Sequence, residues 1–494
     1  MSNNLEEKLD FVIASLSALL PELILIMCLL LVVLLSFRKG LLKASLIIAI
    51  FAPIVTLPLI LFKDTSEPQF LMNNNFVLDD ISKYFKVLFL ITFLYSLFIF
   101  SREGKKSGEQ LSMMLTILIG AFFTASSHNI IVLVLSIEMM SIPAYALTTF
   151  SMDRESGKAG LKYFLLGAVA SAFMLYGLSL LYGFTGTLDI FSLEFIKGLL
   201  VSSPLAVIVA CLFTLGGILF KLSVFPMHVW VKDVYLSAPI SAVAFFSIVP
   251  KIAVLVFFIR FIKSIDSVSL VFIDLNFDWS VFMSFLSLAT IFAGNLAALK
   301  QKDVVGMMAF SSVAHMGYLL VGLIPVSQYG FQATSFYVGA YLLMNMAVFH
   351  MLQVFKRGGL SLQYDAFRGW GRKNIYWVVI VVFLMLALTG LPPTGGFTAK
   401  LMIFSALYDS YLTASKPIII WVILFGLLNV AISLYYYIRL PYIMLIKEPQ
   451  GPVLKFKSKK ADIFVISGTT LALILLFFKP NWLLEIINNV NFVF

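Results

Sequence analysis

The chain has 494 residues, of which 61% are hydrophobic and only 12% are charged, and its mean hydropathy is +1.00. Soluble globular proteins have about 25% charged residues, so a water-soluble fold could not cover this much apolar surface. The net charge of +10 does not indicate nucleic-acid binding, because the basic residues lie in short loops between apolar runs. Both cysteines, Cys28 and Cys211, fall inside such runs, which excludes a zinc, iron–sulfur or c-type haem centre built on cysteine ligands. Composition therefore predicts a polytopic membrane protein.

Fourteen apolar runs are long enough to cross a membrane as helices, which predicts an all-α fold. A transmembrane helix needs about 20 apolar residues to cross roughly 30 Å of hydrocarbon. The runs are continuous and longer than the alternating strands of an outer-membrane barrel, which have about ten residues. In chain order the expected spans are 14–37, 41–62, 81–100, 111–127, 130–150, 161–184, 204–224, 240–262, 280–299, 304–324, 331–355, 375–411, 417–443 and 461–479.

Two of these runs contain helix-breaking sequence. In the seventh, Pro226 removes a backbone donor and disfavours helix at the residue before it. The twelfth would be about 55 Å long as one straight helix, and its middle reads TGLPPTGGFTAK. Broken helices in corresponding positions are typical of inverted repeats with a site near the midplane. The breaks lie five spans apart, so we expect spans 4–8 and spans 9–13 to be two inverted five-helix repeats, although Lys221 precedes its break and Lys400 follows its own.

The repeats divide the chain into four expected parts. These are a three-helix segment at 1–105, a first repeat at 106–265, a second repeat at 275–445, and a C-terminal loop with the last helix at 446–494. Basic loop residues give the orientation, because Lys and Arg are enriched on the cytoplasmic side. The loops after odd-numbered spans hold 22 basic residues and the opposite side holds 9. Both termini should therefore lie on the non-cytoplasmic side.

Four ionisable residues lie deep inside different spans: Glu138, Lys221, Lys251 and Lys400. A charge at a helix centre costs about 2.5–3.5 kcal/mol, so such residues face a polar interior or a partner. Buried lysines and carboxylates change between charged and neutral forms as their neighbours change, which is what a proton relay requires. The alternative is a static buried ion pair, but one acid cannot neutralise three lysines. Broken helices supply free backbone groups that could order the intervening water.

Three further residues are candidates for the relay. Histidine titrates near neutral pH, and His315 in span ten and His228 in the seventh-span break could link the lysines. The alternatives are a structural hydrogen bond between helices for His315, and satisfaction of the backbone groups freed by Pro226 for His228. Lys162 begins the sixth span, where a side chain reaching to the membrane interface is the alternative to a relay role.

The segment FKLSVFPMHVWVKDVYLSAPISAVAFFSIVPKIA at 220–253 resembles the signature of the antiporter-like membrane subunits of respiratory complex I, the NADH–quinone oxidoreductase. Its Asp-Val-Tyr at 233–235 and Pro-Lys at 250–251, with Pro-Glu at 21–22 and Lys400, are most similar to the subunit N branch of that family. The resemblance covers essentially the whole chain, including both breaks. In this order the short motifs are specific.

The resemblance implies a role for each buried charge in a translocase that moves protons while quinone is reduced elsewhere in the complex. Glu138 and Lys221 would form the input half of a proton channel, Lys251 would bridge to the second half, and Lys400 would end it. Lys162 would modulate the first pair. The family also implies a bacterial inner membrane location.

The resemblance further implies that this chain carries no cofactor, with flavin, iron–sulfur clusters and quinone on partner subunits. Its neighbours would be M, K and J-like membrane subunits and the lipid bilayer. Two other functions compete. A subunit of a multisubunit Na⁺/H⁺ antiporter, or of a related membrane-bound redox complex, shares the fold and the buried row. A membrane glycosyltransferase or flippase would need a sizeable extramembrane loop with acidic residues, and the longest loops here lack one.

Overall fold

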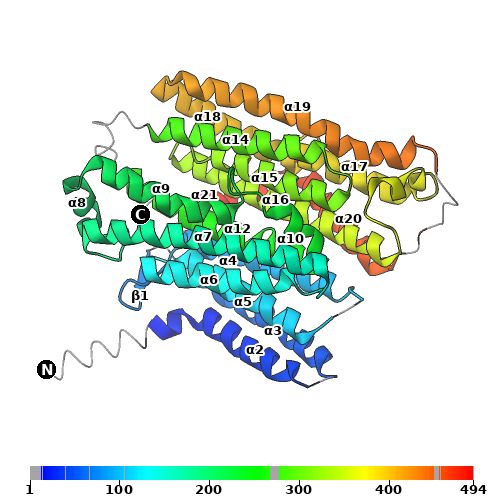
Figure 1. Cartoon of the computed structure of the whole chain (residues 1–494), viewed down its shortest axis with the longest axis horizontal. Coiled ribbons are helices and arrows are strands. Elements are labelled where there is room, and N and C mark those ends of the chain that lie inside the picture. Colours follow the sequence, from blue (N-terminus) through cyan, green and yellow to red (C-terminus); the bar gives the residue numbers. More distant parts are fainter. Residues whose placement is uncertain are drawn as a thin grey trace.

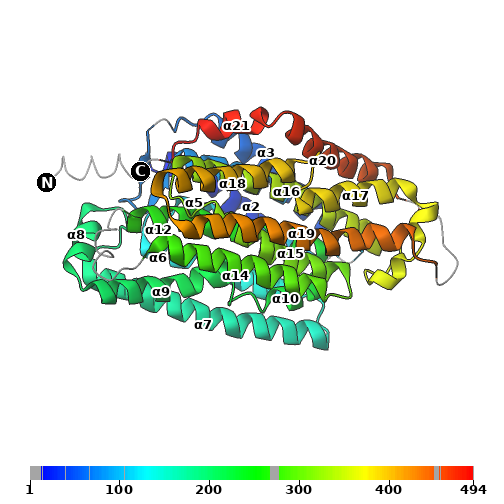
Figure 2. The ribbon, with the colours of Figure 1, turned by 90° about the horizontal axis from the view of Figure 1, so that it is seen from above.

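The computed structural model describes residues 13–492, apart from residues 14, 39, 66, 105, 267–277, 450–455 and 457. Long helices lie roughly side by side, with α2 and α3 at one edge and α19 at the opposite edge (Figure 1). Seen from above, α7 and α20 lie on opposite sides of the bundle (Figure 2). In the described part, the strands are a single antiparallel hairpin, β1 (Gln69–Leu71) and β2 (Phe76–Leu78).

The longer helices coincide with the expected spans, singly or in pairs, whereas α8, α10, η1, η2 and α21 lie between or after the spans. They are α2 (Leu20–Ser36), α3 (Leu42–Leu61), α4 (Asp80–Phe100), α5 (Gly108–Ser126), α6 (Ile130–Thr148), α7 (Arg154–Thr185), α8 (Leu193–Val201), α9 (Pro204–Leu222), α10 (Val231–Ser237), α11 (Ile240–Phe246), α12 (Val249–Asp266), α14 (Trp279–Leu299), α15 (Val304–Val321), α16 (Gln328–Arg357), the 3-10 helices η1 (Tyr364–Phe367) and η2 (Trp370–Lys373), α17 (Ile375–Thr389), α18 (Gly395–Ala414), α19 (Pro417–Leu445), α20 (Lys460–Phe478) and α21 (Asn481–Asn488).

Among the described residues, twelve helical segments are long and apolar enough to cross a membrane, with α11 and α12 counted as one. Two shorter apolar helices, α2 and α17, accompany them. The predicted all-helical polytopic fold is therefore confirmed, and the count of fourteen spans stays a prediction.

Polar residues between the apolar runs start the helices. Asp153 begins α7 with a capping box, in which its side chain accepts from the Ser156 N–H while the Ser156 side chain bonds back. Ser107 caps α5 and Asp303 caps α15 in the same way with one hydrogen bond each. Such caps satisfy backbone donors that a helix start leaves free. The apolar sequence thus sets the helical stretches, and the short polar loops set where each stretch begins.

Both predicted breaks are present. Helix α9 ends at Leu222, and the next residue, Ser223, adopts a left-handed conformation with φ +62°. Helix α10 begins at Val231. Helix α17 ends at Thr389, where Gly390 has φ +81°, and α18 begins at Gly395. Glycine adopts this conformation without strain, whereas serine does so at a cost, a pattern that clusters at functional sites.

A third interruption was not predicted. The eighth expected span is divided into α11, which ends at Phe246, and α12, which begins at Val249. The cause is Pro250, because a proline ring clashes with the carbonyl four residues earlier, and that carbonyl belongs to Phe246. Lys251 therefore lies in the first turn of a new helix rather than in the middle of a continuous one.

The first helices of the two expected repeats have equivalent neighbours. In the first set α5 packs against α6 and α12, and in the second set α14 packs against α15 and α19. The third helices differ, because α7 packs against α9, which precedes its break, and α16 packs against α18, which follows its own. The inverted repeat and the division into four parts stay predictions.

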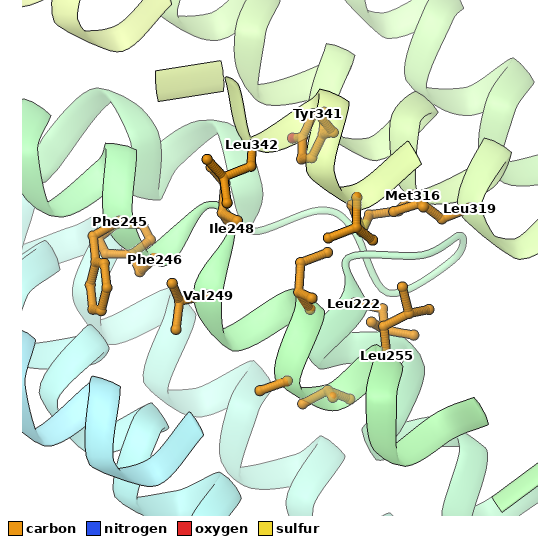
Figure 3. Close-up of a cluster of buried hydrophobic side chains, with 14 of the residues drawn as sticks. Leu222, Phe245, Phe246, Ile248, Val249, Leu255, Met316, Leu319, Tyr341 and Leu342 are labelled. Carbon is orange, nitrogen blue, oxygen red and sulfur yellow. The ribbon is translucent and has the colours of Figure 1, made fainter. Parts of the chain in front are cut away.

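The most buried helices meet where the two sets join. Helices α11, α12, α15 and α16 are almost wholly buried, whereas α3, α19 and α20 expose most of their side chains. Figure 3 shows hydrophobic side chains packed together at the junction, with Met316 of α15 and Leu342 of α16 near Leu222 at the end of α9 and Ile248 between α11 and α12. Any polar group in this region is therefore held away from lipid by protein.

Candidate proton-relay site

Glu138 on α6 and Lys221 in the last turn of α9 form the first ion pair of the predicted row. The Lys221 Nζ lies 3.9 Å from the Glu138 Oε1. It donates to the Ser141 Oγ at 2.6 Å and to the Tyr145 hydroxyl at 3.3 Å. These groups follow Glu138 by three and seven residues, so they lie on the same helix face. The Ser171 hydroxyl donates to Glu138 at 2.6 Å, and the ammonium thus rests in a hydroxyl-lined site beside a carboxylate.

A small cavity joins Lys221 to Lys251. Both lysines line it, together with Trp230, and its volume is about 20 Å³. A cavity needs about 10–15 Å³ to hold one water molecule, so this one has room for a single bridging water. The Lys251 side chain is 1% exposed. Its Nζ donates to the Ser312 Oγ at 3.1 Å and lies 5.6 Å from the centre of the Tyr235 ring.

His315 lies between tyrosines of two other helices. Its Nδ1 is 2.7 Å from the Tyr337 hydroxyl on α16, and its Nε2 is 3.2 Å from the Tyr437 hydroxyl on α19. The imidazole is 2% exposed. It thus connects three helices of the second set and lies one helical turn beyond Ser312, the partner of Lys251.

Lys400 folds back from α18 across its break. Its Nζ donates to the Thr389 carbonyl at 2.7 Å and to the Leu388 carbonyl at 3.4 Å, and it lies 4.4 Å from the centre of the Tyr318 ring. These carbonyls form the C-terminal end of α17, where the helix dipole favours a cation. Lys221 has the corresponding position at the C-terminal end of α9. The Lys221 ammonium, however, bonds hydroxyl groups of α6, whereas the Lys400 ammonium bonds the carbonyl end of the half-helix itself.

Lys162 and His228 are placed apart from these contacts. The Lys162 Nζ bonds the Asp233 carboxylate at 2.6 Å, and both side chains are more than one-third exposed. Because α7 begins at Arg154 rather than at residue 161, Lys162 lies two turns inside the helix instead of at its start. His228 is half-buried in the break, and its ring packs against Phe225.

One end of the row is open at the face formed by α6 and α7. The Glu138 side chain is 33% exposed and that of Lys162 is 43% exposed. Beside them, α7 and the seventh-span break line a hollow of about 600 Å³ whose walls include Leu165, Phe173 and Met227. This face of α6 and α7 carries exposed charged side chains and a hollow, unlike the apolar surface that lipid would cover.

Comparison with known proteins places the chain in a family. Residues 127–432 match the family described as "NADH:quinone oxidoreductase/Mrp antiporter, TM". The NADH-quinone oxidoreductase subunit N 2 of Chloroherpeton thalassium is 33% identical over 446 residues, which are 88% of this chain and 86% of the relative. Subunit N of Pelagibacter ubique is 30% identical over 491 residues, or 97% and 100% of the two chains.

The chain belongs to the subunit N family. Its fold also matches solved structures of larger assemblies. A chain of respiratory complex I from Thermus thermophilus with bound aureothin is 25% identical, with a TM-score of 0.77 over 94% of this chain and 98% of that one. A chain of the Mrp complex from Dietzia sp. DQ12-45-1b is 19% identical, with a TM-score of 0.74 over 96% of each, which shows the fold alone.

This subunit N-family chain also contains buried ion pairs that the sequence did not reveal. The Lys86 Nζ on α4 lies 2.6 Å from the Glu22 Oε1 on α2, and each side chain is 3% exposed. The Arg260 Nη2 on α12 lies 2.8 Å from the Asp79 carboxylate before α4. Lys86 and Arg260 were counted among the nine basic loop residues. Both lie inside helices, as the expected spans 81–100 and 240–262 already implied, with Lys86 in the second turn of α4 and Arg260 on α12.

Another buried cluster attaches the last long helix to the bundle. Asp462 in the first turn of α20 is fully buried and pairs with Arg102 at 3.2 Å, with Arg357, and with the His350 Nε2 at 3.5 Å. The other ring nitrogen of His350 lies 3.2 Å from the Tyr95 hydroxyl. His350 therefore acts as a structural link between helices, outside the row.

The loop between α4 and α5 contains a buried acid outside the spans. Glu103 is 9% exposed and accepts hydrogen bonds from the Ser241 N–H at 2.9 Å and the Gln110 amide at 3.1 Å. Burial raises the pKa of the Glu103 carboxyl, and these hydrogen bonds oppose the shift. Glu103 also lines a polar cavity of about 610 Å³ together with Lys356 and Arg357.

The hydroxyl groups around the row were also missed. Ser141, Ser312, Tyr337 and Tyr437 contact the predicted residues directly. Serine and tyrosine are common in apolar helices, so their presence alone gives no signal; only spacing from a known ionisable residue, as for Ser141, could have found them. Within the described residues, no group of three or more His, Cys, Asp or Glu side chains is arranged to hold a metal ion.

Proposed function

We propose that this chain is a membrane-arm subunit of an NADH–quinone oxidoreductase and moves protons through its buried row while quinone is reduced in other subunits. Membership of the subunit N family supports the assignment to that complex. The observation that carries the proton role is the Glu138–Lys221 pair with a cavity leading to Lys251. Together they form a row of ionisable groups that is open at Glu138 and buried at Lys221 and Lys251.

In the first pair Lys221 holds the proton, and the charge on Glu138 sets how strongly Lys221 holds it. While the carboxylate is charged and 3.9 Å away, it stabilises the Lys221 ammonium. When Glu138 is neutralised or drawn away, Lys221 gives its proton to the water in the cavity. Lys251 lines the same cavity, and its hydrogen-bond partner in the described structure is the neutral Ser312 hydroxyl.

The second half receives the proton and releases it at Lys400. His315 passes it between Tyr437 and Tyr337, and Lys400 holds it at the C-terminal end of α17. Lys162 tunes the input pair from its place beside Asp233.

The open face at α6 and α7 is where a neighbouring subunit would bind. A charged side chain facing lipid costs about 2.5–3.5 kcal/mol at mid-membrane, and a protein partner removes that cost for Glu138. We assign M, K and J-like subunits as neighbours, with flavin, iron–sulfur clusters and quinone on partner chains. The expected location is the bacterial inner membrane, with both termini on the non-cytoplasmic side.

A subunit of a Na⁺/H⁺ antiporter is the second candidate, because the family description names both kinds of complex and the fold matches the Mrp chain. Purification from mild detergent distinguishes the two. Copurification with flavin and iron–sulfur subunits supports the oxidoreductase, whereas small membrane partners alone would support the antiporter. Proton uptake by the reconstituted complex in sodium-free buffer provides a second, independent test.

A further inference from the structure

A narrow groove lies between α17 and α19 on the outside of the bundle. The two helices pack side by side (Figures 1 and 2). The groove has a volume of about 270 Å³, and its walls are almost entirely apolar, with Met385 and Leu386 on α17 facing Ile438 and Tyr442 on α19. Ile438 is 51% exposed and Tyr442 is 47% exposed, so the groove opens outward. It therefore suits an apolar ligand that approaches from the membrane.

The groove is long and thin. It follows α19 from Leu434 to Ile446, which is about 18 Å at a rise of 1.5 Å per residue. One leaflet has a comparable depth, because the hydrocarbon core of a bilayer is roughly 30 Å thick. The volume spread over this length gives a mean width of about 4–5 Å, far less than the 10–12 Å diameter of a helix. Carbon atoms in contact are about 3.5–4.0 Å apart, so the groove has the thickness of one acyl chain.

A guanidinium and an ammonium group lie at the end of the groove where α19 finishes. The Arg372 Nε donates to the Leu445 carbonyl at 3.2 Å, and its Nη2 donates to the Ile446 carbonyl at 3.2 Å. Both of these partners line the groove. The Lys447 Nζ lies 5.8 Å from the centre of the Tyr442 ring, which forms part of the groove wall. Two cations thus contact the walls of the groove directly.

The same end carries an excess of positive charge. Residues 370–374 and 445–449 contain three basic residues, Arg372, Lys373 and Lys447, and one acid, Glu448, and all four side chains are exposed. Basic pockets between membrane helices bind the headgroups of anionic lipids. A guanidinium group also matches the geometry of phosphate oxygens. The apolar groove and its charged end therefore have the two parts of a phospholipid site.

The larger hollow beside α7 lacks this excess of charge. Its walls are also apolar, and Lys158 and Lys162 line it. Each lysine is already paired with an acid, Lys158 with Glu155 at 2.9 Å and Lys162 with Asp233 at 2.6 Å. An anionic headgroup would have to break these pairs, so the groove between α17 and α19 is the better site for such a lipid.

We propose that this groove holds one acyl chain of an anionic phospholipid, with the lipid phosphate beside Arg372, Lys373 and Lys447. The inner end of the groove is formed by Thr389 and Tyr437. The hydroxyl of Tyr437 lies 3.2 Å from the His315 Nε2 on the far side of the ring. The lipid thereby becomes part of the wall that separates the His315 contacts from the membrane. The inference concerns lipid binding and does not depend on the proposed proton transfer.

Photo-crosslinking tests which molecule fills the groove. The whole complex is reconstituted in vesicles of equal phosphatidylglycerol and phosphatidylcholine, with the exposed wall residue replaced as Ile438→benzoylphenylalanine. On illumination this side chain bonds to C–H groups beside it, and mass spectrometry identifies the adduct. Adducts with phosphatidylglycerol should predominate. Equal adducts with the two lipids would show that the headgroup is not selected, and an adduct with another subunit would show that protein fills the groove; either result overturns the inference.

Charge variants give the expected size of the preference. Each basic group beside an anionic headgroup favours binding by about fivefold, so three such groups opposed by Glu448 should favour phosphatidylglycerol by about 25-fold. Lys373→Gln with Lys447→Gln should bring the ratio close to one, and it keeps Arg372, which holds the end of α19. The matched control is Lys300→Gln with Lys302→Gln, two exposed lysines in the loop between α14 and α15, outside the groove. The control should keep the preference, and an equal loss in both double variants would contradict a local site.

Native mass spectrometry of the complex without the photoreactive residue provides an independent measurement. The unsubstituted complex should retain one more phosphatidylglycerol molecule than the complex with Lys373→Gln and Lys447→Gln. The complex with Lys300→Gln and Lys302→Gln should match the unsubstituted one. The same number of retained lipids in all three complexes would overturn the inference.

Discussion

Replacing Lys221 by alanine removes the ammonium that lies 3.9 Å from the Glu138 carboxylate. Coulomb's law with an effective dielectric constant of about 20 gives about 4 kcal/mol for two unit charges at this distance. Because the Glu138 side chain is one-third exposed, screening lowers this value to about 2 kcal/mol. That energy corresponds to about a 30-fold change in rate, and Lys221→Ala should slow proton transfer through this chain by about that factor.

The assay is proton uptake into vesicles that contain the whole reconstituted complex, measured per NADH oxidised and against time. Lys158→Ala is the matched control, because Lys158 is an exposed lysine whose ion pair with Glu155 lies at the surface. Surface pairs of this kind contribute about 0–1 kcal/mol, so this variant should pump normally. Lys221→Arg should also be slow, because arginine keeps its charge and does not release a proton.

If the assembled complex with Lys221→Ala takes up protons as fast as the complex with Lys158→Ala, the Glu138–Lys221 ion pair has no part in proton transfer. A variant complex that fails to assemble is examined through Lys221→Arg, which keeps the positive charge beside Glu138. Normal pumping by Lys221→Arg would contradict the requirement for a releasable proton.

Three other predictions concern stability and orientation. Lys86→Met should lower the free energy of unfolding by about 3–5 kcal/mol, because it leaves Glu22 charged and buried. The double variant Lys86→Met with Glu22→Leu should recover most of the lost stability, as measured by thermal unfolding of the protein in detergent. Burial raises the pKa of Glu103, so the folded chain binds this proton more tightly than the unfolded chain, and stability falls as the pH rises above about 4.3. Glu103→Gln should flatten that dependence between acidic and neutral pH, and an unchanged slope would contradict the assignment. Tags at Ser2 should react with an impermeant reagent from the non-cytoplasmic side and tags near Lys457 should not; both positions lie outside the described residues.

The helical fold and both breaks follow from sequence because their physical signals are local. Apolar runs of membrane-crossing length have few alternatives to helix, and proline with glycine in the middle of a run predicts an interruption. The interruption before Lys251 was missed because Pro250 stands alone near the middle of its expected span, without the neighbouring glycines of the twelfth span, and a single proline is tolerated in a continuous membrane helix. The clash with the Phe246 carbonyl is evident only once α11 is known to be helical.

The residues of the proposed relay can be predicted only in part from the sequence. Glu138, Lys221, Lys251 and Lys400 stand out because each charge interrupts an apolar run. The partner of each is set by packing between distant helices, as for Lys251 with Ser312 or Lys86 with Glu22. Lys162 had a weaker sequence signal because it begins the sixth expected span, and the structure places it beside Asp233 with both side chains more than one-third exposed.

Lys221 and Lys400 each lie beside the end of a half-helix, although one residue precedes its break and the other follows it. Their nitrogens have different partners there, because Lys221 bonds hydroxyl groups of α6 and Lys400 bonds the carbonyls that end α17. A hydroxyl can both donate and accept a hydrogen bond, whereas a carbonyl only accepts. The surroundings of Lys221 therefore suit the neutral amine as well as the ammonium, and those of Lys400 favour the ammonium.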